Sequence, residues 1–119
     1  MNNLLWRKAL TQAKHCDVKL TTVVAVVSID DTPLFAVTNR RGSGKVSKWT
    51  NHAEELAVKR LARWYTGNRL DDFQLHVIRF RNNGSVGMAK PCSGCNSLVT
   101  KVFKKVYYTN DIGNFERLF

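Results

Sequence analysis

The chain carries the stretch Asn51-His52-Ala53-Glu54-Glu55 and, further along, the stretch Pro91-Cys92-Ser93-Gly94-Cys95. Together they supply one histidine and two cysteines, which are ligand types that zinc prefers. In a catalytic zinc site the protein gives three ligands and water takes the fourth position, whereas four protein ligands close a structural site. Glu54 then lies beside the metal without binding it. These residues predict a site that activates water, with the carboxylate carrying protons between water and a substrate.

In this order the two stretches resemble the zinc-dependent cytidine deaminase superfamily, whose signature is H-x-E followed by P-C-x-x-C. Either motif alone has little specificity, because His-x-Glu triplets arise by chance and Cys-x-x-Cys occurs in other zinc and redox sites. The pair is specific, since both halves open helix-like runs and a strand-like segment separates them. A purely structural zinc site and a redox pair are the alternatives, and the redox alternative leaves His52 and Glu54 without a role.

The resemblance implies a zinc-dependent hydrolase that converts cytosine to uracil. It implies that His52, Cys92 and Cys95 bind Zn²⁺. It also implies that Glu54 transfers protons from water to the ring nitrogen and to the departing ammonia. It also implies three contacts with the substrate. The Asn39 side chain binds the sugar, the Ala53 N–H donates to the pyrimidine carbonyl, and the Lys90 carbonyl accepts from the amino group. Asn39 is equally typical of a turn residue that ends a strand.

The apolar periodicity of the chain predicts an α/β fold. We expect helices over residues 3–16, 52–65 and 95–103, and strands over residues 20–27, 34–38, 73–80, 106–109 and 115–119. The continuous apolar run at 20–27 indicates a central strand covered on both faces, and turn residues at 30–33 join it to the next strand as a hairpin. His76, midway along its strand, is expected to be a packed or edge residue and not a metal ligand.

The resemblance also implies how these elements assemble. It implies a three-layer α/β/α architecture, with a five-stranded mixed sheet between helices, in a single domain over residues 1–119. Turn-forming residues at 110–114 predict a C-terminal β-hairpin. Such a hairpin is more similar to the cytidine deaminase and viral or toxin-type branches than to the adenosine-tRNA and deoxycytidylate deaminase branches, where a helix usually joins the last two strands.

The composition bounds the class of protein. At 119 residues, with 44% hydrophobic and 24% charged residues, the chain is typical of one soluble globular domain. No apolar run approaches the roughly 20 residues that cross a membrane, and the N-terminus lacks the apolar core of a signal peptide. Cys16 stands outside the Cys-x-x-Cys pair and is left unpaired, which favours a reducing compartment. We therefore expect a cytoplasmic protein without a membrane partner.

The net charge of the chain is +10, an excess of cations that attracts polyanions such as nucleic acid. A basic loop from Arg40 to Trp49 precedes the first motif. Arg40 and Arg41 are candidates for phosphate contacts, and Trp49 is a candidate for stacking on a base. The segment Arg79-Phe80-Arg81, near the second motif, favours the same partner. The alternatives are a solvated connector for the loop, a lid on the core for Trp49 and a merely soluble basic protein.

The substrate is predicted less directly than the chemistry. The charge favours a polynucleotide, DNA or RNA. Single-stranded DNA is preferred over duplex, because a paired base must be flipped out at a cost of a few kcal/mol. The alternatives are a deaminase of free cytidine, deoxycytidine or deoxycytidylate and, outside enzymes, a zinc-stabilised nucleic-acid-binding module. Retention of Glu54 argues against the module, since a structural site does not use that carboxylate. The sequence leaves open the oligomeric state and the biological role, whether editing, toxin or salvage.

Overall fold

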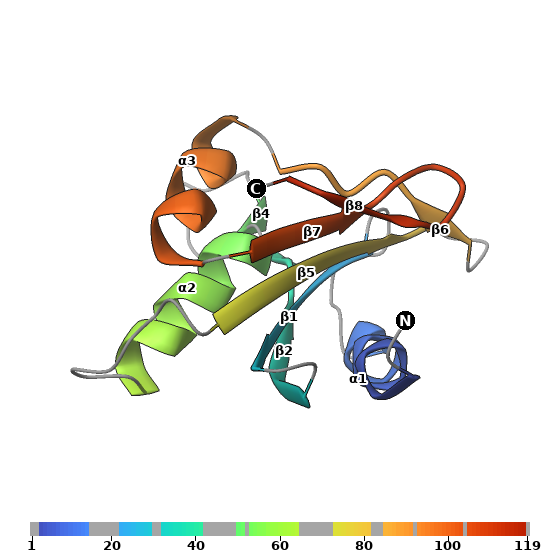
Figure 1. Ribbon diagram of the computed structural model, residues 1–119. Coiled ribbons are helices and arrows are strands. Elements are labelled where there is room, and N and C mark those ends of the chain that lie inside the picture. Colours follow the sequence, from blue (N-terminus) through green and yellow to red (C-terminus); the bar gives the residue numbers. More distant parts are fainter. Residues whose placement is uncertain are drawn as a thin grey trace.

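The computed structural model describes residues 3–14, 22–29, 32–41, 50–51, 53–64, 73–81, 85–91, 93–103 and 105–118 (Figure 1). In chain order these residues form α1 (Asn3–Ala13), β1 (Thr22–Ile29), β2 (Thr32–Thr38), β3 (Arg40–Arg41), β4 (Thr50–Asn51), α2 (Ala53–Trp64), β5 (Phe73–Phe80), β6 (Val86–Gly87), α3 (Ser93–Val102), β7 (Lys105–Thr109) and β8 (Phe115–Arg117). The predicted α/β class is confirmed.

The main sheet has the strand order β2-β1-β5-β7-β8. β1 pairs antiparallel with β2 and β5, β5 pairs parallel with β7, and β8 returns antiparallel beside β7. This confirms the predicted mixed sheet and both predicted hairpins, but within the described residues the sheet has six strands and not the five predicted. The short β6 also pairs with β5, at Arg79↔Gly87 and Phe80↔Val86. At Arg79 and Phe80, β1 pairs with one edge of β5. β6 therefore lies along the other edge of β5, beyond the end of its pairing with β7.

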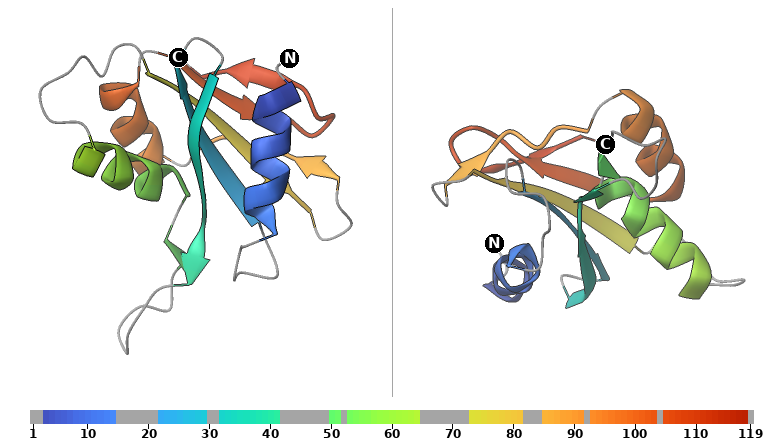
Figure 2. Two further views of the ribbon diagram at one scale, coloured as in Figure 1. Left: turned by 90° about the horizontal axis from the view of Figure 1, so that it is seen from below. Right: turned by 180° about the vertical axis from the view of Figure 1, so that it is seen from behind.

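Helices cover both faces of this sheet, because successive strand residues point to opposite sides. Figures 1 and 2 show α1 by itself on one side and α2 and α3 together on the other. On the α1 side, Leu5 and Ala9 pack against a buried cluster of Val24, Val26, Ala36, Ile78 and Phe80. The larger cluster joins the sheet to α2 and α3, and it includes Ala25, Val27, Val37, Ala57, Leu61, Leu75, Val77, Val99, Phe103 and Val106. The three-layer α/β/α architecture is therefore confirmed.

The C-terminal hairpin turns through residues that stabilise it locally. The Asn110 side-chain oxygen accepts hydrogen bonds from the N–H groups of Ile112 (3.1 Å) and Asn114 (2.9 Å). The Asn110 N–H also donates to the Asn114 carbonyl at 2.8 Å. Gly113 has a φ of 84°, a left-handed conformation that glycine adopts without steric cost. An Asx turn and one glycine thus bring β8 back beside β7.

Three features differ from the sequence expectation. α1 ends at Ala13, and the last residues predicted for it, His15 and Cys16, lie outside the described residues. The basic loop is closed at its base by the β3–β4 pair, and β6 forms within a connection predicted to be a turn. Both extra pairings involve strands of two residues, which are too short to show an alternating pattern. Within the described residues, no helix is both long and apolar enough to span a bilayer.

Candidate active site

One end of the sheet gathers the segments that carry the predicted site. β2 and β5 are both antiparallel to β1, and β7 is parallel to β5. These three strands therefore run in the same direction, and their carboxyl ends lie at one end of the sheet. Val23 of β1 pairs with Arg79, which pairs in turn with Gly87. A single row across the sheet thus connects β1, β5 and β6 at this end.

Asn39 begins that row. Its N–H donates to the Val23 carbonyl at 3.1 Å, and its side-chain oxygen accepts the Val23 N–H at 2.9 Å. The side chain is buried, with 6% of its surface exposed. These bonds extend the β1–β2 ladder one residue past the Val24↔Thr38 pair. Asn39 therefore has the strand-ending role that the sequence gave as its alternative, and its contact with a sugar stays a prediction.

The β3–β4 pair places the first motif next to Asn39. Arg40 follows Asn39 directly and pairs with Asn51, while Arg41 pairs with Thr50. The chain then passes from Asn51 to the start of α2. The side chains of Arg40 and Arg41 and all of His52 and Trp49 lie outside the described residues. Their predicted contacts to metal, phosphate and base accordingly stay predictions.

α2 begins with Ala53, which is fully buried, and continues with Glu54, of which only 5% is exposed. The next residue, Glu55, has a side chain that is 41% exposed and forms an ion pair with Lys59 at 2.9 Å. Two adjacent carboxylates thus have opposite environments. Both lie in the first turn, where the helix dipole favours negative charge. Burial of Glu54 fits a carboxylate that serves a site within the protein, because a carboxylate without such a role usually stays on the surface, as Glu55 does.

The segment before the second motif runs along the carboxyl end of β7. The Ala89 N–H donates to the Thr109 carbonyl at 2.8 Å. Ala89 and Pro91 are buried, and Lys90 between them is exposed. α3 then begins at Ser93, one residue after Cys92. Cys92 and the side chain of Cys95 lie outside the described residues.

These elements fit the zinc site that the sequence predicts. His52 immediately precedes α2, Cys92 immediately precedes α3, and Cys95 lies in the first turn of α3. The two helices pack against each other. A helix start favours the thiolate form of cysteine, which is the form that binds zinc. One imidazole and two thiolates are a donor set known from catalytic zinc sites.

The sequence interpretation overlooked Thr109 and gave Arg81 a different role. Thr109 is fully buried at the end of β7, and its hydroxyl donates to the Gly87 carbonyl at 2.7 Å. Arg81 forms an ion pair with Asp111 at 2.9 Å, and Phe80 is only 8% exposed. The interpretation of residues 79–81 as favouring a polynucleotide partner stays a prediction. The one sequence signal for the role of Thr109 was its position as a polar residue at the end of a largely apolar strand.

His76 is packed, as predicted. It is 7% exposed, its ring stacks on Tyr107 with 4.8 Å between centroids, and Phe115 meets it edge-on at 5.1 Å. Aromatic contacts of this kind stabilise a side chain within the sheet. His76 lies on the α1 side, since its neighbour in the register is Val26. The zinc motifs belong to the helices on the other side.

Known proteins share this fold. The family model for the zinc-binding region of cytidine and deoxycytidylate deaminases matches residues 2–110. A cytidine deaminase from Burkholderia pseudomallei has a similar structure, with a TM-score of 0.69 and 20% identity over 95% of this chain and 87% of that one. For a cytidine deaminase from Mycobacterium tuberculosis the TM-score is 0.65, with 20% identity over 98% and 89%. For a dCMP deaminase from the cyanophage S-TIM5 it is 0.61, with 22% identity over 90% and 80%. No curated protein sequence matches the chain.

Proposed function

Because the chain belongs to the cytidine and deoxycytidylate deaminase family and is a zinc-dependent deaminase of the cytosine base, we propose that its substrate is cytosine in a single-stranded polynucleotide. The observation that carries the proposal is the pair of arginines, Arg40 and Arg41, that directly follows Asn39 and pairs with the strand before the first motif. The site itself lies where Asn39, the start of α2 and the segment that ends in Pro91 occupy one end of the sheet.

In this proposal the zinc is held by His52, Cys92 and Cys95. The bound zinc supplies Lewis acidity, which lets water act as a nucleophile near neutral pH. The positions of Cys92 immediately before α3 and of Cys95 in its first turn support the assignment, because backbone N–H groups and the helix dipole favour the charged thiolates there. The thiolates also require a reducing compartment, so the proposed site belongs in the cytoplasm.

Glu54 moves the protons of the reaction. Its carboxylate takes a proton from water, and the oxygen adds to the ring carbon that bears the amino group. The protonated Glu54 then donates that proton to the ring nitrogen. It takes the second proton from the hydroxyl group now on the ring carbon and passes it to the amino group, which leaves as ammonia while the uracil carbonyl forms. Cytosine and water give uracil and ammonia, so the reaction needs no oxidant or reductant. Burial of Glu54 at 5% exposure supports the role, because bulk water is then kept from its proton.

Backbone groups orient the base. The first N–H groups of a helix have no partner within it, so the Ala53 N–H is suited to the pyrimidine carbonyl. The Lys90 carbonyl accepts from the amino group that leaves, and Asn39 contacts the sugar. Lys90 is held between buried Ala89 and buried Pro91, which limits how far its carbonyl can move.

The choice of a polynucleotide is supported by charge near the site. The net charge is +10, and Arg40 and Arg41 directly follow Asn39. In the proposal these arginines contact phosphates and Trp49 stacks on a base next to the target. The alternative is a free nucleoside or nucleotide. It is supported by the similar structures, which are named as cytidine and dCMP deaminases.

The experiment compares both substrate classes at low and high salt. A cytosine-containing single-stranded oligonucleotide is tested beside free cytidine, deoxycytidine and deoxycytidylate. We expect uracil in the oligonucleotide, with a rate that falls steeply as salt rises, because phosphate contacts release counterions. Turnover of the free compounds alone would overturn the polynucleotide proposal in favour of the alternative.

A matched pair of double variants locates the phosphate contacts. Arg40→Ala with Arg41→Ala removes two cations beside Asn39, whereas Arg7→Ala with Lys8→Ala removes two exposed cations from α1 on the other side of the sheet. Each single-strand phosphate contact adds about 0.7 to the log–log slope of affinity against salt. We expect the first pair to reduce the slope by up to about 1.4 and the second to leave it unchanged. Equal losses would show that only the overall charge matters.

A further inference from the structure

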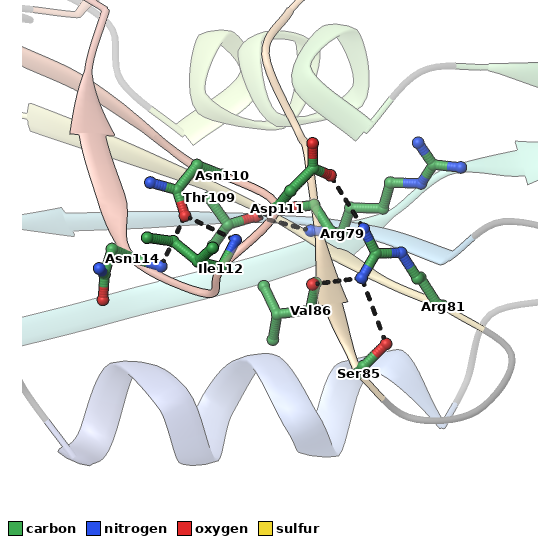
Figure 3. A network of polar contacts seen from close by, with 10 residues as sticks. Arg79, Arg81, Ser85, Val86, Thr109, Asn110, Asp111, Ile112 and Asn114 are labelled. Atoms are coloured by element: carbon green, nitrogen blue, oxygen red, sulfur yellow. Dashed lines mark hydrogen bonds and ion pairs between the residues drawn. The ribbon is translucent and has the colours of Figure 1, made fainter.

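The C-terminal hairpin holds the chain that leads to the second motif. Residues 85–91 connect β5 to that motif, and they run beside the end of β7 and the turn before β8. Figure 3 shows the polar contacts at this place, with Arg79, Arg81 and Val86 on one side and Thr109 and Asp111 on the other. Two residues that are distant in sequence, Thr109 and Arg81, make the contacts to residues 85–89.

Thr109 binds the segment from within the protein. Its hydroxyl donates to the Gly87 carbonyl at 2.7 Å and accepts the Arg79 N–H at 3.3 Å. Its carbonyl accepts the Ala89 N–H at 2.8 Å. Thr109 is fully buried, so water does not replace these bonds when they are lost. One residue thereby fixes the segment at two points, Gly87 and Ala89.

Arg81 binds the same segment from the surface. Its guanidinium donates to the Val86 carbonyl at 3.0 Å, to the Ser85 hydroxyl at 3.4 Å and to Asp111 at 2.9 Å. The side chain also lies against Gly87, where an added Cβ would come within 3.1 Å of the guanidinium Nε. A side chain at position 87 would therefore require the arginine to shift slightly, and the arginine covers β6 where Thr109 binds it from inside.

The residues that Thr109 and Arg81 bind, from Ser85 to Ala89, come shortly before the proposed site in the sequence. Ala89 is held by Thr109, and Lys90, Pro91 and Cys92 follow immediately. Pro91 restricts the backbone further, because its ring fixes φ. A displacement at Gly87 or Ala89 therefore passes to Lys90 and Cys92 with few rotatable bonds between them.

We infer that Thr109 and Arg81 are positioning residues for the site, since they fix the path of the segment that places the Lys90 carbonyl and Cys92. The inference rests on the roles proposed above for Lys90 and Cys92. Neither Thr109 nor Arg81 contacts the substrate in this arrangement. Their effect is on the geometry of the reacting groups, where a shift of about 1 Å lowers rates by up to about a hundredfold.

The experiment uses three substitutions. Thr109→Val removes the hydroxyl and keeps the branched shape, and Thr109→Ser keeps the hydroxyl. The control is Ser28→Ala, because Ser28 is also fully buried in the sheet and its hydroxyl has no hydrogen-bond partner within the described part of the chain. For each variant we measure the rate at which a chelator removes zinc, kcat and KM on whichever substrate the wild type deaminates, and the unfolding midpoint.

We expect Thr109→Val to lose zinc about tenfold faster and to lower kcat about tenfold, with a smaller change in KM. Thr109→Ser should return both values to within about twofold of the wild type, and Ser28→Ala should match the wild type. An unfolding midpoint that falls in Thr109→Val while zinc loss and kcat stay unchanged would overturn the inference. Equal defects in Thr109→Ser and Thr109→Val would also overturn it.

Arg81→Ala keeps the inference testable if Thr109→Val does not fold, because the Arg81 side chain is 41% exposed. We expect about threefold faster zinc loss from Arg81→Ala, a smaller effect than removal of the buried hydroxyl. Unchanged zinc loss from a folded Arg81→Ala would overturn the inference for Arg81. The zinc measurement needs no substrate, so a failure of the polynucleotide proposal is distinguished from a failure of this one. A wild type that binds no zinc would overturn both.

Discussion

The two motifs are reached by connections of different kinds. The first follows β3 and β4, a pair of two-residue strands in which Arg40 lies opposite Asn51. It ends in a helix start whose first residues, Ala53 and Glu54, are buried. The connection to the second motif passes through β6. It is held by a buried hydroxyl, two backbone hydrogen bonds and an exposed guanidinium. It ends with a single exposed residue, Lys90, between two buried ones.

This difference indicates a division of roles. The first motif contributes one proposed zinc ligand and the carboxylate that transfers protons. The second contributes two of the three ligands and a backbone carbonyl, and none of its residues transfers a proton in the proposal. Damage to the first motif at Glu54 should therefore stop the chemistry and spare the metal, whereas damage to the second should remove the metal itself.

The largest effect is expected from Cys95→Ser, which removes one of two thiolates in the second motif. The variant should lose zinc and all measurable deamination. Its free energy of unfolding should fall by about 4 kcal/mol when free zinc exceeds its dissociation constant about a thousandfold, because the metal binds only the folded chain. Zinc content by atomic absorption and denaturant unfolding measure both effects. Cys16→Ser is the matched control, and loss of zinc from it in equal measure would contradict the assignment.

The next effect compares adjacent carboxylates in the first motif. Glu54→Gln should lower kcat by about a thousandfold, within the range for loss of a general acid–base group, and should keep its zinc. Glu55→Gln is the control, since Glu55 is half exposed and pairs with Lys59 on the helix surface. It should keep its activity and lose less than about 0.5 kcal/mol of stability. If Glu54→Gln loses zinc or keeps its rate, the proton-transfer role is wrong.

Much of this architecture could be predicted from sequence because it rests on strong periodic signals. The strand predicted at 73–80 is β5 to the residue. β1, which includes residues 22–27 of the predicted apolar run, is a central strand in contact with both layers of helices. The hairpin after β7 follows from the turn chemistry of Asn110 and Gly113. In each case local sequence and tertiary packing favour the same structure.

The missed features depend on contacts between distant residues. β3, β4 and β6 have two residues each, so their pairing follows from where the chain has already been placed and not from a pattern within them. The bond from Thr109 to Gly87 spans 22 residues. The bonds of Asn39 to Val23 likewise depend on the register of β1 and β2, so the sequence alone leaves its strand-ending role open beside the predicted sugar contact. The zinc ligands stay a prediction of the sequence, since their side chains lie outside the described residues.

The smallest effect is expected from Asp111→Asn, which tests the surface contact of Arg81 separately from the buried contact of Thr109. Asp111→Asn weakens the ion pair with Arg81 and leaves the bond from Arg81 to the Val86 carbonyl in place. Because the two side chains are 41% and 66% exposed, water and salt screen the pair. We expect a loss of less than about 1 kcal/mol in unfolding free energy, which disappears at high salt, and no change in kcat or zinc retention. A loss of zinc as fast as that of Thr109→Val would show that the surface ion pair, and not the buried hydroxyl, holds the path to Cys92.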